Sequence, residues 1–169
     1  MPNILIETFL KMKRTLLTTF IKRKAEAYGQ NLHINGYSTV TKHTLLGENV
    51  NFNGMQILGE GKVMIGSNFH SGTGCMIITS VHNYDHGQTI PYDEVYINKS
   101  VIIEANVWFG NNVIVLGGVR IGEGSIIQAG STVIKDIPSC AIAGGHPAQV
   151  FKYRDQQHYL KLKQEKKFF

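Results

Sequence analysis

The sequence predicts an all-β solenoid, and three features of its residue pattern lead to that fold class. An aliphatic or phenylalanine side chain recurs at every sixth residue from Ile97 to Val133. A second, mostly small residue follows each of these by four positions, and the two share one face because side chains alternate along a strand. A period of six also differs from the periods of an α-helix and of a simple strand. It is typical of a hexapeptide β-helix, in which each repeat forms one flat side of a triangular coil.

Residues 1–30 are expected to form an N-terminal amphipathic helix, with helical periodicity over residues 4–28 and Gly29 as its stop. Apolar side chains recur in it at intervals of three or four residues, with basic residues between them: Phe9, Met12, Leu16 and Phe20. Two interpretations stay open. The helix caps the open end of the solenoid, as terminal units of repeat proteins do, or it makes a peripheral contact with an anionic membrane surface.

Residues 31–152 are expected to form the β-helix domain. Its first half holds two registers of the six-residue pattern, with one extra residue between Leu58 and Ile65 that we interpret as a bulge or corner loop. The larger break runs from Ile77 to Ile97, twenty residues where the period asks for six, so about fourteen leave the coil. This excursion loop, at about residues 82–96, is a candidate functional segment because loops on a rigid scaffold often carry function.

After Ile137 the repeat decays, and residues 153–169 are expected to form a C-terminal helix, from about Arg154 to Lys167. A length of 169 residues with 43% hydrophobic and 17% charged residues indicates one folded domain and excludes a disordered chain. The net charge of +5 comes from basic residues at the two ends, without the aromatic-lined basic stripe of a nucleic-acid surface.

The residue pattern predicts no targeting signal. The first residues lack the basic start and cleavage site of a signal peptide, and no apolar run reaches the length of a membrane span. Cys75 and Cys140 lack the spacing of a metal site, and a buried thiol is the simplest interpretation of Cys75. These features predict a cytoplasmic protein, with the inner face of the membrane as an option opened by the N-terminal helix.

Three segments together resemble the hexapeptide-repeat acyltransferase superfamily: SVHNYDHG at 80–87, residues 105–138, and AGGHPAQVFK at 143–152. The resemblance is greatest to the galactoside, maltose and xenobiotic O-acetyltransferases and to sugar O-acetyltransferases of surface polysaccharide biosynthesis. It implies a left-handed parallel β-helix with an extended catalytic loop and a short C-terminal helix. It also implies a homotrimer with sites between neighbouring coils, acetyl-CoA as co-substrate, no required metal, and a saccharide acceptor.

By this resemblance His82 is the general base that removes a proton from the acceptor hydroxyl, a task that suits imidazole near neutral pH. The alternative is a surface-loop histidine without a task. Asp85 or Glu94 is a candidate to orient the His82 ring, and solvated acids are the alternative. The expected acceptor-binding residues are Asn51, Asn53, Asn83, Tyr84 and Asp85. Asn51 and Asn53 also fit a second interpretation, because Asn tolerates the left-handed backbone of a coil corner.

The same resemblance assigns residues to the donor. Trp108, on an outward position, is expected to line the cleft for the pantetheine arm, with Asn111 nearby and small Ala129 and Gly130 where the arm approaches the backbone. Lys135 and Lys152 are expected to face the nucleotide phosphates, with Ile134 beside them. Two positions depart from the family. Lys152 replaces an arginine and Gln149 a basic residue, which predicts weaker or rearranged donor binding because lysine lacks the bidentate phosphate contact.

Rival functions stay open. An N-acetyltransferase acting on an amino sugar uses the same scaffold. A metalloenzyme like the γ-class carbonic anhydrases needs three histidines, and His86 would have to combine with His33, His43 or His70. A non-catalytic assembly solenoid is disfavoured by the histidine loop and the outward tryptophan.

Overall fold

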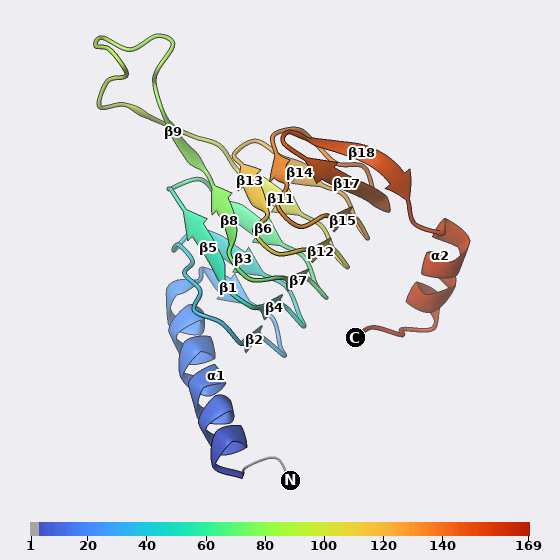
Figure 1. Ribbon diagram of the computed structural model, residues 1–169. Coiled ribbons are helices and arrows are strands. Elements are labelled where there is room, and N and C mark those ends of the chain that lie inside the picture. The colour runs from blue at the N-terminus through green and yellow to red at the C-terminus, as the bar shows by residue number, and fades with distance from the viewer. Residues whose placement is uncertain (1–3) are drawn as a thin grey trace.

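The computed structural model describes residues 4–169, so the first three residues of the predicted N-terminal unit lie outside the described part. The chain forms a parallel β-solenoid whose coils stack along one axis (Figure 1). Helix α1 (Ile4–Lys24) lies at the first coil and helix α2 (Gln156–Gln164) follows the last. The predicted solenoid with a helix at each end is therefore confirmed. Within residues 4–169, neither helix combines the length and the apolar character needed to cross a bilayer.

Three sheets form the walls of the solenoid. The first contains, in spatial order, β1 (Ala27–Tyr28), β3 (Thr44–Leu46), β6 (Val63–Ile65), β11 (Val101–Ile103) and β14 (Arg120–Ile121). The second contains β2 (His33–Ile34), β4 (Asn51–Phe52), β7 (His70–Ser71), β12 (Trp108–Phe109), β15 (Ile126–Ile127), β17 (Ala141–Gly145) and β18 (Ala148–Tyr153). The third contains β5 (Met55–Leu58), β8 (Cys75–Ile78), β13 (Ile114–Leu116) and β16 (Thr132–Val133). Strand pairs in these walls are parallel except the last pair of the second sheet, β17 and β18.

The core fills the interior of the coils, as the six-residue period predicts. From Ile103 to Val133 the residues of the main register are completely or almost completely buried. Phe52, Phe69 and Phe109 stack edge-to-face along the axis, with ring centroids 5.9 and 5.0 Å apart. Some of the small inward residues are polar, and their hydroxyl groups form hydrogen bonds with the backbone. Ser131 Oγ, for example, donates to the Gln128 carbonyl at 2.7 Å and accepts from Gly145 N–H at 3.1 Å.

Two predicted core positions are wrong. Leu58 is 41% exposed because strand β5 alternates inward and outward, and Ile57 takes the inward position at 2% exposure. The backbone then turns at Gly59, whose φ of +94° is a left-handed conformation. Ile97 is 40% exposed because it lies in β10 (Tyr96–Asn98), outside the coil. The coil resumes at Val101, which is fully buried.

The helix boundaries also differ from the prediction. The first helix ends at Lys24 rather than residue 28, because Glu26 N–H donates to the Thr44 carbonyl and Gly29 N–H to the Leu46 carbonyl, both at 2.9 Å. These bonds carry the chain into the first sheet as β1. The last helix begins at Gln156 rather than Arg154, because Arg154 N–H still bonds the Cys140 carbonyl at 2.8 Å. Asp155 caps it by accepting from the His158 N–H at 3.0 Å.

One corner of the coil is built from stacked asparagines in the left-handed conformation. Asn49, Asn68 and Asn106 have φ of 53°, 56° and 62°. Their amides bond one another along the axis, from Asn49 to Asn68 at 3.0 Å and from Asn68 to Asn106 at 2.9 Å. The series ends where Asn106 donates to the Glu123 carboxylate at 3.0 Å and to the Tyr159 hydroxyl at 2.9 Å. Because Tyr159 belongs to α2, this corner fixes where the C-terminal helix sits.

The Glu123 carboxylate strengthens that attachment. It accepts from the Tyr159 hydroxyl at 2.9 Å and pairs with Lys163 Nζ at 2.6 Å. Burial acts to raise the pKa of Glu123, but Lys163, Tyr159 and Asn106 outweigh it and hold the pKa below its ordinary value. Burial also raises the pKa of Tyr159, which stays a neutral donor. Helix α2 is therefore bound to the coil by a charged network rather than by an apolar face.

Candidate active site

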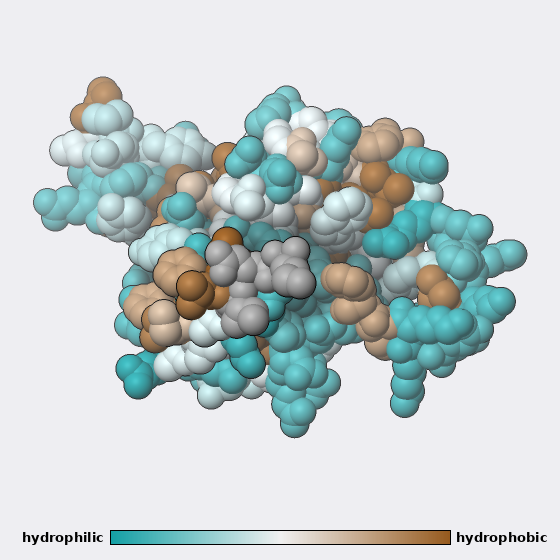
Figure 2. Space-filling view, turned by 60° about the horizontal axis from the view of Figure 1, so that its bottom comes forward, coloured by the Kyte–Doolittle hydropathy of each residue, from teal (hydrophilic) through white to brown (hydrophobic). Residues whose placement is uncertain are grey.

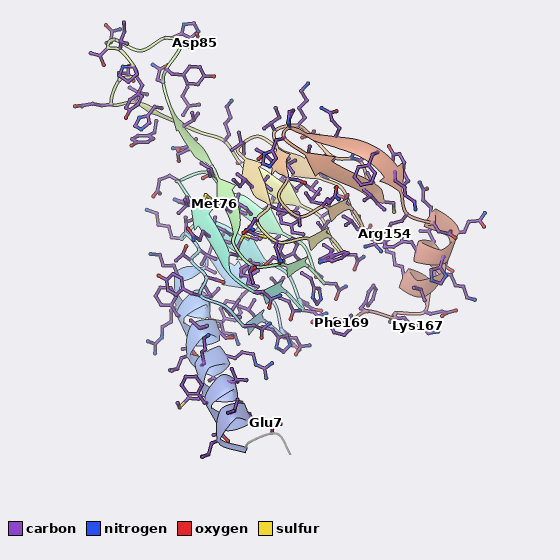
Figure 3. All side chains as sticks on the ribbon, in the orientation of Figure 1. Glu7, Met76, Asp85, Arg154, Lys167 and Phe169 are labelled. Atoms are coloured by element: carbon purple, nitrogen blue, oxygen red, sulfur yellow. The ribbon has the colours of Figure 1, made fainter. Side chains whose placement is uncertain are left out.

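The excursion predicted between Ile77 and Ile97 forms a hairpin arm, defined here as residues 80–98. Its base is an antiparallel pair, β9 (Ser80–His82) and β10 (Tyr96–Asn98), in which His82 lies opposite Tyr96. The arm projects from one corner of the solenoid (Figure 1), and Asp85 lies near its tip (Figure 3). No residue of the arm is fully buried. It is therefore a segment that the coil supports at its base only.

His82 lies at the base of the arm with its imidazole ring between two tyrosine rings. The Tyr92 ring stacks on it at a centroid distance of 3.8 Å and an angle of 17°, and the Tyr96 ring lies at 4.2 Å and 39°. These three residues line an open pocket of about 310 Å³ together with Thr89, Asp93 and Glu94. The Nδ1 atom is buried without a hydrogen-bond partner among the described residues. The ring is thus fixed by stacking, and its hydrogen-bonding capacity is not taken up at Nδ1.

Asp93 organises the arm around this histidine. Its carboxylate accepts from Val95 N–H at 3.0 Å, from Gln88 N–H at 3.2 Å and from the Asn83 amide at 3.3 Å. The Val95 N–H is the main cause of a lowered pKa, so the Asp93 carboxylate stays ionised and closes the loop on itself. Among the acids of the arm, the sequence pattern led to Asp85 and Glu94 but not to Asp93. The signal for this role is a carboxylate near the end of the loop, with backbone N–H groups close to it in sequence that it can bind.

The three predicted acceptor residues of the arm do not line the His82 pocket. Asn83 is held by Asp93 and also accepts from the His86 N–H at 3.4 Å. Asp85 is exposed and lies 3.9 Å from His86. Tyr84 lines a separate pocket on the coil side, with Lys99 and Leu116. Within residues 4–169 no hydrogen bond joins Asp85 or Glu94 to the His82 ring, whereas Glu94 lines the same pocket, so the orientation of the ring by an acid stays a prediction.

A second candidate surface lies on the outer face of the second sheet, around Trp108. The indole is 52% exposed, and its strand neighbours in register are His70 on one side and Ile126 on the other. A pocket of about 430 Å³ beside it brings together three predicted donor residues, Trp108, Asn111 and Ala129. The same pocket is lined by Phe151 of β18, which the sequence analysis did not select. It is an aromatic and aliphatic surface with an amide at one end.

The remaining predicted donor residues lie around this pocket rather than in it. Gly130 has φ of +72°, and a β-carbon there would meet no atom within 4 Å, so the backbone is open to an approaching ligand. Ile134 and Lys135 are exposed and follow strand β16 of the third sheet. Lys152 lies opposite Ile142 on β18. Within one chain, therefore, Lys135 and Lys152 do not line the pocket beside the Trp108 indole.

The predicted acceptor residues in and just after β4 make contacts between coils. Asn53 Nδ2 donates to the Ser71 carbonyl at 2.7 Å, and its Oδ1 accepts from the Asn35 amide at 3.0 Å. Asn51 lies opposite His70, and its amide donates to the Asn49 carbonyl at 3.3 Å. The interpretation of both residues as left-handed corner residues is wrong, because Asn51 lies in strand β4 and neither residue has a positive φ; the corner asparagines are others, such as Asn49 and Asn68. Neither residue lines the His82 pocket or the Trp108 pocket just described.

On the other side of Trp108, a pocket of about 450 Å³ separates the second sheet from the C-terminal segment. Arg154, Lys167 and Phe169 surround it (Figure 3). The Phe169 ring lies 5.6 Å from the His70 ring, and burial lowers the pKa of His70. Arg154 Nε is buried without a hydrogen-bond partner in the described chain. The indole thus forms a wall shared by two pockets, one apolar and one with basic residues.

The four histidines considered for a metal site are not gathered in one chain. His43 Nε2 lies 3.1 Å from the Glu60 carboxylate, and His86 is on the exposed arm beside Asp85. Across residues 4–169 no group of three or more His, Cys, Asp or Glu side chains is arranged to hold a metal ion.

Comparison with known proteins agrees with this architecture. The bacterial transferase hexapeptide family model, which comprises six repeats, matches residues 100–135. The galactoside O-acetyltransferase of Escherichia coli is 34% identical over 140 residues, which are 80% of this chain and 62% of that protein. The galactoside O-acetyltransferase of Lactococcus lactis is 40% identical over 100 residues, 59% of this chain and 47% of that protein. The chain thus spans about half to three fifths of the length of these relatives.

A solved structure shows the same likeness in three dimensions. A galactoside acetyltransferase in complex with coenzyme A superimposes with a TM-score of 0.68 and 28% identity. The superposition covers 83% of this chain and 71% of that one.

Proposed function

This chain is a hexapeptide-repeat protein related to the galactoside O-acetyltransferases, and on that premise we propose that it transfers an acetyl group from acetyl-CoA to a sugar hydroxyl. The observation that carries the proposal is the environment of His82. The ring is clamped between Tyr92 and Tyr96 in an open pocket, and its Nδ1 has no partner among the described residues. A fixed imidazole that lines an open pocket is what a general base requires, and because Nδ1 is buried we assign the proton transfer to Nε2.

The reaction proceeds by direct transfer. His82 takes the proton of the acceptor hydroxyl as that oxygen attacks the thioester carbonyl, and a tetrahedral intermediate forms. When the intermediate collapses, the carbon–sulfur bond breaks and the imidazolium returns its proton to the leaving thiolate. The products are the acetyl ester and CoA with its thiol restored. Proton transfer of this kind contributes about 10²–10⁴-fold to a rate, and the remainder comes from holding donor and acceptor together.

Donor binding is assigned to the face of Trp108. The indole, Ile126 and Phe151 offer an apolar surface for the pantetheine arm, and the open backbone at Gly130 permits amide contacts. Lys135 and Lys152 supply positive charge for the nucleotide phosphates as point charges. Support comes from the related galactoside acetyltransferase, whose structure is a complex with coenzyme A.

A homotrimer, implied by the family resemblance, is part of the same proposal. In one chain the His82 pocket and the Trp108 pocket share no residue, whereas acetyl transfer requires the base and the thioester to be in contact. We therefore place the complete site between the arm of one copy and the second sheet of its neighbour. The acceptor is a saccharide, and surface polysaccharide biosynthesis is the setting that we propose for it.

The test compares two histidines of the same arm. His82→Ala is expected to lower turnover at least about 100-fold, in keeping with the loss of a general base, with CoA affinity unchanged. His86→Ala is the matched control, since His86 is exposed and lies outside the His82 pocket, and it should retain full turnover. A thiol-release assay with sugar acceptors measures both.

Two results would contradict the proposal. If His82→Ala keeps its turnover, the residue is not the base. If the product resists hydroxylamine, the acetyl group is on an amine and the enzyme is an N-acetyltransferase.

A further inference from the structure

Helix α1 is attached to the solenoid along one face and near its C-terminal end. Ile21 is fully buried and Leu17 packs against the core. Thr18 Oγ1 accepts from Ile34 N–H of β2 at 3.3 Å. The first turns of the helix extend beyond the coils (Figure 1). The capping role expected from the sequence therefore accounts for the second half of α1 and leaves the first half without a packing function.

The face of α1 opposite this attachment carries an apolar stripe. Its members follow one another at intervals of four, three, four and four residues, which places them on one side of a helix, and they are Leu5, Phe9, Met12, Leu16 and Phe20. Their exposed fractions are 76, 60, 56, 65 and 49%. At 1.5 Å per residue the stripe is roughly 22 Å long. Figure 2 turns this end of the molecule forward and shows apolar surface on the side that faces the viewer.

The same helix carries one of the two concentrations of positive charge in the sequence, and the other lies at the C-terminal end. Six basic residues lie on α1 against one acid, Glu7, and they are Lys11, Lys13, Arg14, Lys22, Arg23 and Lys24. The helix therefore has a net charge of +5, equal to that of the whole chain, and the charges of the remaining residues cancel. None of the six takes part in a salt bridge within residues 4–169, although Lys22 Nζ lies 5.2 Å above the Tyr28 ring.

We infer that α1 is a membrane-binding element that lies on an anionic lipid surface. The stripe supplies the apolar side that enters the boundary between headgroups and acyl chains, and the unpaired cations supply attraction to lipid phosphates. Pairing with the α1 stripe of a second copy is disfavoured, because it would bring two helices of charge +5 together. A lipid surface is the partner that satisfies both the apolar stripe and the charge. The inference does not depend on the proposed acetyl transfer.

The test is flotation of the full-length chain with vesicles of two compositions. The protein is expected to float with phosphatidylcholine vesicles that contain phosphatidylglycerol and to remain in solution with phosphatidylcholine alone. The double variant Phe9→Ser/Leu16→Ser removes apolar contact, and Lys11→Glu/Lys13→Glu reverses charge. Each is expected to lower the partition coefficient at least about tenfold, because interfacial binding depends on apolar burial and on charge together. Raising the salt concentration should weaken binding of the unaltered chain.

Leu58→Ser is the matched control, since Leu58 is an exposed apolar residue of the coil at 41% exposure. It should float like the unaltered chain. Circular dichroism of each variant shows whether the fold is retained, and a second pair, Leu5→Ser/Met12→Ser, replaces any variant that misfolds.

Three outcomes would overturn the inference. The unaltered chain fails to float with anionic vesicles, the stripe and charge variants float as well as it does, or the stripe variants change the molar mass in light scattering without changing flotation. The last result would make the stripe an interface between copies. Acetyltransferase turnover, measured separately on a soluble saccharide, keeps a failure of this inference distinct from a failure of the proposed function.

Discussion

The stacked coils and the hairpin arm use apolar side chains in opposite ways. In the coils, inward residues such as Val101, Ile103 and Phe109 are almost completely buried, and each strand inside a wall bonds to the coil before and after it. In the arm, residues 80–98, no side chain is fully buried, and Tyr84, Tyr92 and Tyr96 remain largely exposed. The stability of the molecule therefore resides in the coils, and the chemistry that we propose resides on a segment that contributes little to it.

This separation has a physical basis. A coil strand is stabilised by the burial of the apolar side chains on its inward face, and its outward side chains contribute little to that stability. The arm is closed by its own hydrogen bonds, chiefly those to the Asp93 carboxylate, and by the antiparallel pair at its base. Segments with few buried contacts open at low free-energy cost. Substitutions in the two regions should thus change different measurements.

The largest effect is expected from a core substitution, and it tests the comparison within one strand. Phe109 is fully buried against Phe69, whereas its neighbour Trp108 is 52% exposed. Phe109→Ala should lower the free energy of unfolding by about 3–5 kcal/mol. Trp108→Ala should cost less than about 1 kcal/mol, as surface substitutions do. Urea denaturation measures both, and equal losses would show that the outer face also holds the coil together.

The coil was the part of the fold that its sequence predicted well. From Ile103 to Val133 every main-register position is buried as the period requires. The prediction failed at Leu58 and Ile97, which border the interruptions of the repeat. The six-residue period identifies inward residues only while the repeat is uninterrupted. At an insertion, the hydrogen bonds of the corner determine which residue is the next to point inward.

The site was predictable to a smaller extent, for a related reason. Trp108, Asn111 and Ala129 share a pocket because they lie on neighbouring coils of a regular repeat. Tyr92 and Tyr96 were not selected, since their contact with His82 depends on hairpin pairing and loop closure, which no periodicity encodes. Lys135 follows a strand of the third sheet and Lys152 lies in the second, and no contact within the described chain brings them together.

An intermediate effect is expected on the arm, at Tyr92. Its ring stacks on His82 and is 45% exposed, so it acts as a positioning residue and adds little to stability. Tyr92→Leu should lower kcat about tenfold, because a small misplacement of a reacting group costs this much or more, with the free energy of unfolding unchanged within about 0.5 kcal/mol. Tyr92→Phe keeps the ring and should restore kcat.

Steady-state kinetics with acetyl-CoA distinguishes positioning from folding. The KM for acetyl-CoA should stay constant in both Tyr92 variants, since the donor is assigned to the Trp108 face. A parallel loss of stability and turnover in Tyr92→Leu would mean that the arm contributes to the fold, and the contrast between arm and coil would fail.

The smallest effect is expected at a coil corner, where the coils differ from the arm in backbone conformation. Left-handed residues occur in the coils at positions such as Asn68, Asn106 and Gly124, while no residue of the arm has this conformation. Cys140 occupies such a corner with φ of 58°, and its conformation is held by two bonds. Its N–H donates to the Glu123 carbonyl at 2.7 Å, and its carbonyl accepts from the Arg154 N–H at 2.8 Å.

Since asparagine tolerates this conformation better than cysteine does, Cys140→Asn should raise the free energy of unfolding by about 0.5 kcal/mol. Cys140→Val should lower it by about 1–2 kcal/mol, because a β-branched side chain is most strained there. Cys140→Ala, which keeps the β-carbon, isolates the contribution of the sulfur. Thermal unfolding of the three variants ranks them. If Asn and Val prove equal, the corner relaxes when its side chain changes, and the left-handed backbone is not the constraint that separates the coils from the arm.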